Sequence, residues 1–172
     1  MIKQLLLVIF AIVVIVAVAA FMRPDSYRVE RAITINAPPE RVFPLINDFD
    51  NFAVWSPWEK LDPEMERQIS PVSSGKGAIY EWRGNSKAGA GRMEILESTP
   101  SSRILVKLDF LKPFESHNSS EYTLQPKGDS TTVTWAMYGP SPFASKVMQV
   151  FMTMDQMIGK DFERGLASMK RG

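Results

Sequence analysis

Residues 27–46, with the sequence YRVERAITINAPPERVFPLI, contain the two patterns that decide the fold. Over residues 27–35, apolar side chains recur at every second position, with Arg31 as the exception. This alternation predicts a strand with one buried face. Pro39 suits the first turn of a helix, where its missing N–H is not needed, and Glu40 suits the positive helix N-terminus. We therefore expect a strand that leads directly into a helix ending near Asn47.

The chain that follows this helix alternates in short segments separated by turn residues. A short helical piece is expected near 52–55, stopped by Pro57. Strands linked by short turns are typical of an antiparallel sheet. The expected strands cover residues 65–70, 78–83, 89–95, 104–110, 114–125 and 131–138.

The last element is expected to be one long amphipathic helix. Ser141 is suited to its N-cap and Pro142 to its first position. Apolar residues then recur in steps of three or four up to Met169, which predicts a continuous apolar stripe with a bend near Gly159 and Gly165. An antiparallel sheet with one apolar face must be covered, so this helix is expected to pack on it. The predicted class is α+β, with a curved antiparallel sheet wrapped around a long C-terminal helix.

N-terminal to the first expected strand, residues 5–22 form an apolar segment without a charged or hydrogen-bonding side chain. As a helix this segment would be about 27 Å long, close to the hydrocarbon thickness of a bilayer. The segment is compatible with a single-span anchor or with a cleaved secretory signal, for which Ala17–Ala20 offer small residues at the cleavage site. The apolar part of a signal is usually shorter, which favours the anchor. We expect residues 1–23 to be a transmembrane anchor and residues 24–172 to be one domain. The flanking charges do not determine on which side of the membrane this domain lies.

The composition excludes several classes of function. The 20 Lys and Arg and 19 Asp and Glu are mixed along the chain and give a net charge of +1, without the basic face typical of a nucleic-acid binder. The absence of cysteine excludes disulfides, thiol nucleophiles and cysteine metal sites. A single histidine excludes metal sites built on several imidazoles. We therefore expect no nucleic-acid partner, no metal and no cofactor.

Four passages resemble the START-like superfamily, the helix-grip or SRPBCC proteins that include polyketide cyclase/dehydrase-like and Bet v 1-like members. They are VERAITINAPPERVF at 29–43, WSPWEK at 55–60, TVTW at 132–135 and the long C-terminal helix. The resemblance covers about residues 26–170. It implies a deep apolar cavity between the sheet and the C-terminal helix that binds a hydrophobic small molecule.

Strand alternation predicts which side chains would line such a cavity, or would fill the same space as a packed core. The predicted lining residues are Trp55, Trp58, Tyr80, Trp82, Met93, Leu108, Phe110, Asn118, Ser120, Tyr122, Trp135, Met137, Phe151, Met154 and Ile158. Ser116, Asn118 and Ser120 would supply polar groups for a ligand head group or a water molecule. His117 falls on the opposite strand face beside Glu115 and is expected at the surface.

Three functions are compatible with this sequence. The first is a membrane-tethered domain that binds or carries a hydrophobic small molecule or lipid. The second is a cyclase, dehydratase or hydrolase in which a Tyr80 or Tyr122 hydroxyl, aided by Asn118, polarises a carbonyl. No acid–base pair is recognisable, so no catalytic residue is assigned. The third is a non-catalytic accessory module that contacts a membrane protein.

Overall fold

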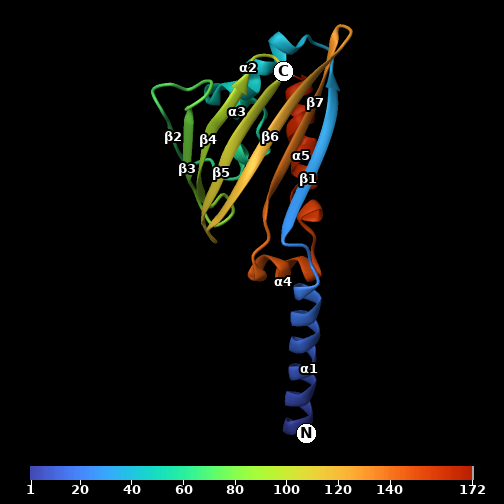
Figure 1. Ribbon diagram of the computed structural model, residues 1–172. Helices are drawn as coiled ribbons and strands as arrows, with labels where there is room; N and C mark the ends of the chain where they lie inside the picture. Colours follow the sequence, from blue (N-terminus) through green and yellow to red (C-terminus); the bar gives the residue numbers. More distant parts are fainter. Residues whose placement is uncertain (172) are drawn as a thin grey trace.

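The computed structural model describes residues 1–171, and its main feature is a curved seven-stranded antiparallel sheet (Figure 1). The strand order is β1-β7-β6-β5-β4-β3-β2, so the first and last strands are neighbours in space. The strands are β1 (Ser26–Ile35), β2 (Glu66–Ile69), β3 (Ile79–Arg83), β4 (Ala90–Thr99), β5 (Arg103–Lys112), β6 (Ser116–Lys127) and β7 (Ser130–Pro140). Apart from the β7–β1 pairing, sequential strands pair with each other, as expected for a meander.

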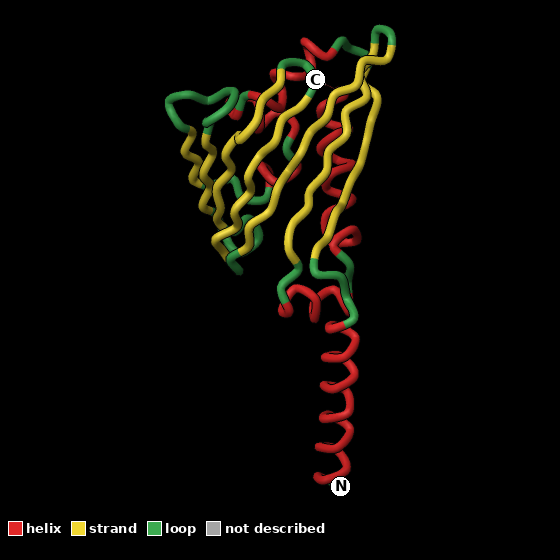
Figure 2. Tube along the Cα trace, in the orientation of Figure 1, coloured by secondary structure: helices red, strands yellow, loops and turns green. Residues whose placement is uncertain are grey.

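Helices cover one face of this sheet and extend beyond one end of it (Figures 1 and 2). The helices are α1 (Ile2–Phe21), α2 (Pro39–Asn47), α3 (Phe52–Trp55), α4 (Phe143–Phe151) and α5 (Met154–Arg171), with two short 3-10 turns, η1 (Phe49–Asn51) and η2 (Pro57–Lys60). Helix α5 packs against β1, α3 and η2, and the apolar side chains between them and the sheet form the core. The predicted α+β helix-grip architecture is therefore confirmed.

The two ends of the sheet differ in what lies beside them. At one end of the sheet, which we call the proximal end, β1 begins and β7 ends. The β3–β4 and β5–β6 connections lie at the same end. Ser26 pairs with Pro140 there, and the C-terminal end of α1 adjoins it. The distal end carries the β2–β3, β4–β5 and β6–β7 connections.

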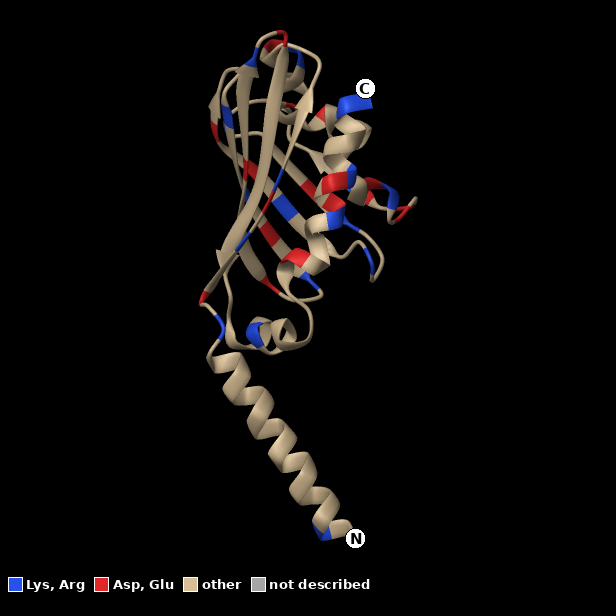
Figure 3. Cartoon of the chain, turned by 90° about the vertical axis from the view of Figure 1, so that its right-hand side faces the viewer, with Lys and Arg blue, Asp and Glu red and all other residues tan. Residues whose placement is uncertain are grey.

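Helix α1 is long and apolar enough to cross a membrane, and of its residues only Ala20 is buried. It projects from the proximal end, and charge colouring shows blue only at its far tip (Figure 3). At 20 residues it is about 30 Å long. The expected apolar helix at residues 5–22 is present, but it begins earlier, at Ile2, and ends at Phe21.

The single C-terminal helix expected from Ser141 onward is wrong, because α4 and α5 are separate helices. The break falls at Met152 and Thr153 rather than near the two glycines. Thr153 caps α5, since its hydroxyl oxygen accepts the Gln156 N–H at 3.3 Å while the Gln156 side chain accepts the Thr153 N–H at 2.9 Å. This reciprocal pair is a capping box, and a capping box begins a new helix.

The two glycines of α5 allow close packing instead of a bend. A Cβ at Gly165 would lie 3.0 Å from the Trp135 ring and 3.1 Å from Pro57. A Cβ at Gly159 would collide with the Arg31 guanidinium, which crosses the helix at this position. Both positions therefore let α5 lie close to the sheet and to η2.

Arg31 links β1 to α5 through two carboxylates. Its guanidinium donates to Asp155 at 2.7 Å and to Glu163 at 2.8 Å. The hydrogen bond from Arg31 lowers the pKa of Asp155. A carboxyl group with a lowered folded-state pKa stabilises the fold above its ordinary pKa, and this contribution is lost as the pH falls through the folded-state value.

We therefore expect Arg31→Gln to reduce the acid sensitivity of the fold. Wild type should lose more of its free energy of unfolding than the variant between neutral pH and about pH 3, because only wild type loses the Arg31–Asp155 attraction in this range. Urea unfolding at both pH values measures the difference. Arg164→Gln is the control, because Arg164 is exposed and pairs with Asp161 within the same helix, α5. Equal acid losses in wild type and Arg31→Gln would contradict the prediction.

Candidate functional site: the concave face of the sheet

Aromatic rings fill the centre of the concave face. The Trp135 ring stacks on Phe162 of α5, with centroids 4.0 Å apart and planes at 2°. Trp55 meets Trp135 edge-on at 5.4 Å, and Trp58 does so at 5.5 Å. Tyr122 also stacks with Trp135, with centroids 5.3 Å apart and planes at 25°. These residues close the space between sheet and α5 that the resemblance implied would be a deep cavity.

The proximal half of the same face is less completely covered. Trp82 and Phe110 meet edge-to-face at 5.9 Å and are only partly buried. Tyr27 on β1 and Met154 and Ile158 on α5 are also partly buried against the core. We call these five residues the proximal apolar surface.

Gly91 and Ala88 position Trp82 on this surface. The Trp82 ring lies directly over Gly91, where a Cβ would collide with it. The indole N–H donates to the Ala88 carbonyl at 3.0 Å, and that hydrogen bond orients the ring. A glycine on β4 therefore makes room for an aromatic ring of β3 on the concave face.

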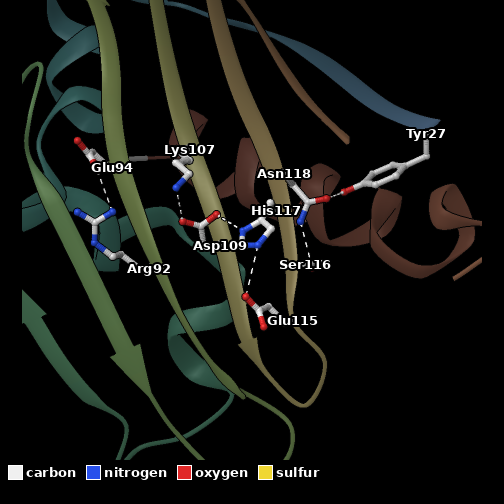
Figure 4. A network of polar contacts seen from close by, with 9 residues as sticks. All are labelled: Tyr27, Arg92, Glu94, Lys107, Asp109, Glu115, Ser116, His117 and Asn118. Atoms are coloured by element: carbon white, nitrogen blue, oxygen red, sulfur yellow. Dashed lines mark hydrogen bonds and ion pairs between the residues drawn. The ribbon is translucent and has the colours of Figure 1, made fainter. Parts of the chain in front are cut away.

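The hydroxyl of Tyr27, a member of the proximal apolar surface, forms a polar pair with Asn118 (Figure 4). The Tyr27 hydroxyl donates to Asn118 Oδ1 at 2.7 Å, and Asn118 Nδ2 donates to Ser116 Oγ at 3.2 Å. Burial raises the pKa of Tyr27 to about 12, so its hydroxyl remains a hydrogen-bond donor at neutral pH. The pairing of Asn118 with Tyr80 or Tyr122 considered for an enzyme is not found, since Tyr27 is its partner.

The predicted lining residues divide into three groups by position. The buried ones are Trp55, Tyr80, Met93, Leu108, Asn118, Ser120, Tyr122, Trp135 and Met137. The partly buried ones are Trp58, Trp82, Phe110, Met154 and Ile158. Phe151 is 74% exposed, and its assignment to the lining is wrong because it belongs to α4, which lies beyond the sheet.

The two best-formed hollows in the described part of the chain are open and lie away from the space between the sheet and α5. One, of about 410 Å³, lies between the β3–β4 and β5–β6 connections, bordered by Asn85 and Pro113. The other is on the outer side of α5, bordered by Lys160 and Ala167. Neither of these two hollows is bordered by a residue of the proximal apolar surface.

The sequence analysis missed a buried charged cluster. Glu59 is 8% exposed and accepts hydrogen bonds from the Tyr80 hydroxyl and from Arg67 Nε, the latter at 2.5 Å. Burial and the Glu59 carboxylate raise the pKa of Tyr80, and the same carboxylate raises that of Arg67. The cluster ties η2 to β2 and β3, so we assign it a structural role.

His117 lies on the outer face of the sheet, as expected from alternation (Figure 4). Its Nδ1 lies 2.8 Å from Asp109 and its Nε2 lies 3.5 Å from Glu115. Burial raises the pKa of Asp109, but Lys107 and His117 lower it more, so the net shift is downward. The Asp109–His117 pair was not foreseen, although the two residues lie directly opposite each other in the β5–β6 register.

Known structures share this fold at low sequence identity. A solution structure from Thermobifida fusca has a TM-score of 0.61 and 19% identity, covering 83% of this chain and 90% of that one. The Aha1 dimer from Colwellia psychrerythraea has a TM-score of 0.55 and 14% identity, covering 85% and 99%. Ara h 8.0201 has a TM-score of 0.53 and 15% identity, covering 86% and 99%. At these identities the likeness establishes the fold alone.

Comparison with protein families gives a match over nearly the whole domain. A search of curated protein sequences finds no significant match. The family model described as polyketide cyclase / dehydrase and lipid transport matches residues 26–172, which include the sheet, α4 and α5. The chain therefore belongs to the polyketide cyclase / dehydrase and lipid transport family.

Proposed function

We propose that this protein is a membrane-tethered domain that binds a hydrophobic small molecule or lipid on the proximal apolar surface. One observation carries the proposal: the incompletely covered part of the concave face lies at the end of the sheet from which α1 projects. The family description, which includes lipid transport, supports a ligand of this class.

Tethering would favour the capture of a ligand that partitions into a bilayer. A binding surface held at the membrane meets such a ligand at a high effective concentration, without any new contact. Trp82 and Phe110 offer flat apolar rings, while Tyr27 and Asn118 offer a hydroxyl and an amide to a polar head group. The filled centre of the face limits the ligand to the proximal half.

Native mass spectrometry of residues 24–172, purified without detergent, tests the proposal together with organic extraction of bound material. The family match begins at residue 26, and the aligned region covers 90–99% of the three similar chains described above, which supports the use of residues 24–172 as one domain. We expect a defined lipid-sized adduct that is reduced severalfold in Phe110→Ser, because a polar group would replace a ring on the binding surface.

Leu96→Ser is the matched control, because Leu96 is an exposed apolar residue of β4 outside the proximal apolar surface. This variant should keep the adduct. Two results would contradict the proposal: a protein without any adduct after incubation with membrane extract, or equal adduct in wild type and Phe110→Ser.

A further inference from the structure

Helix α4 exposes its apolar side and turns its polar side toward the domain. It has no buried residue, and Phe143, Met148 and Phe151 are 55%, 44% and 74% exposed. On the inner side, Lys146 is only 12% exposed, and Gln149 donates to Ser141. Surface helices of globular proteins show the opposite arrangement, so the apolar side of α4 is suited to an apolar environment outside the domain.

The position of α4 is fixed relative to α1. Helix α4 packs against α1 just where α1 leaves the domain, and Ala20 is buried there. Asp25, in the connection between α1 and β1, accepts the Ser141 N–H at 2.7 Å and pairs with Lys146. The exposed side of α4 is therefore held at the level at which α1 would enter the bilayer interface.

A second exposed apolar segment lies at the same end of the domain. Leu111, near the end of β5, and Phe114, in the β5–β6 connection, are 55% and 77% exposed, and they flank Lys112 and Pro113. This connection belongs to the proximal end by strand topology and lies on the α4 side of the sheet in Figures 1 and 2. Apolar residues beside a lysine are typical of segments that enter a lipid headgroup region.

We propose that α4 and the β5–β6 connection insert into the interface of the bilayer that α1 crosses, so that the proximal end of the domain lies against the lipid surface. This inference rests on the proposed membrane tether and adds an orientation to it. The lipid surface is the occupant that fits, because α4 packs against the candidate membrane helix α1 and exposes Phe143, Met148 and Phe151. In this orientation the proximal apolar surface opens toward the source of an apolar ligand.

Fluorescence quenching of the full chain in phosphatidylcholine/phosphatidylglycerol vesicles tests the orientation. Because the chain has no cysteine, single substitutions give clean labelling sites for an environment-sensitive fluorophore. Phe151→Cys and Phe114→Cys probe the proposed contact, Ile12→Cys probes the middle of α1, and Val72→Cys is the control. Val72 is a matched control because it is 61% exposed and apolar but lies in the distal β2–β3 connection.

We expect lipids carrying a shallow nitroxide to quench most of the emission at positions 151 and 114, while aqueous iodide quenches position 72. Deep nitroxides should quench position 12. Iodide quenching at 151 and 114, with position 12 still in lipid, would overturn the orientation and leave the tether standing. Absence of lipid quenching at position 12 would overturn both. Protection of position 151 from lipid and iodide alike would indicate a protein contact and also overturn the inference.

Discussion

Trp135→Ala is expected to lower the free energy of unfolding of residues 24–172 by about 3–5 kcal/mol, the range typical of a buried tryptophan replaced by alanine. Trp135 is 1% exposed, and its ring contacts Phe162, Tyr122, Trp55 and Trp58. Removing the ring would leave a cavity between the sheet, α3 and α5. Surrounding side chains collapse only partly into such a space, so the lost contacts are not recovered.

A second loss comes from the indole N–H, which donates to Ser120 Oγ at 2.8 Å. Trp135→Phe separates the two contributions, because it keeps an aromatic ring and removes the donor. We expect it to cost less, about 1–3 kcal/mol, the range for a buried polar group that loses its partner. Urea unfolding followed by far-ultraviolet circular dichroism measures both variants. A loss below about 1 kcal/mol in Trp135→Ala would show that these stacked rings do not form the core.

Trp135 also illustrates what the sequence could and could not predict. Strand alternation placed it on the concave face together with Tyr122, and the structure confirms that placement. Alternation assigns a residue to a face but does not say what packs against it. The close approach of α5 depends on Gly165, a residue that the sequence analysis interpreted as a helix bend. Strand alternation therefore allowed either a cavity or a packed core at the centre of the face, and the resemblance favoured the cavity.

The division of the C-terminal region into α4 and α5 was visible in the sequence but was outweighed by another pattern. Apolar residues continue at helical spacing through Phe151 and Met154, which predicted one helix. Thr153 and Gln156, at the spacing of a capping box, marked the second start. The apolar residues of the two helices face different surroundings, and this difference is set by the tertiary structure rather than by the local spacing.

The buried Glu59 cluster and the Asp109–His117 pair could not be found from local patterns. Arg67, Tyr80 and Glu59 come from β2, β3 and η2, so their meeting depends on how η2 crosses the sheet. Asp109 and His117 meet because of one strand register, and a shift by one residue would separate them. Both are long-range consequences of the fold, and periodicity carries no information on them.

Deleting residues 1–23 is expected to move the protein from the carbonate-washed membrane fraction to the soluble fraction. The most apolar 18-residue stretch of α1 has a mean hydropathy of 3.1, and α1 exposes its side chains over almost its whole length, so insertion into a bilayer would cover that surface. Each Leu, Ile, Phe or Val at the centre of a spanning helix favours insertion by about 0.3–0.6 kcal/mol. Weak binding through α4 alone should not survive the wash, because nine residues bury little apolar area.

A point substitution tests the same anchor without shortening the chain. Val13→Arg places a charge in the middle of α1 and should reduce the membrane fraction, because a central arginine costs about 2.5–3.5 kcal/mol on insertion scales. Val13→Leu, the matched control, should behave as wild type. The intact mass of the membrane-bound protein distinguishes an anchor from a signal sequence, since cleavage near Ala17–Ala20 would remove most of α1. A mass that retains residues 1–23 supports the anchor, whereas a shortened soluble product would mean that the tether, and any function that depends on it, is wrong.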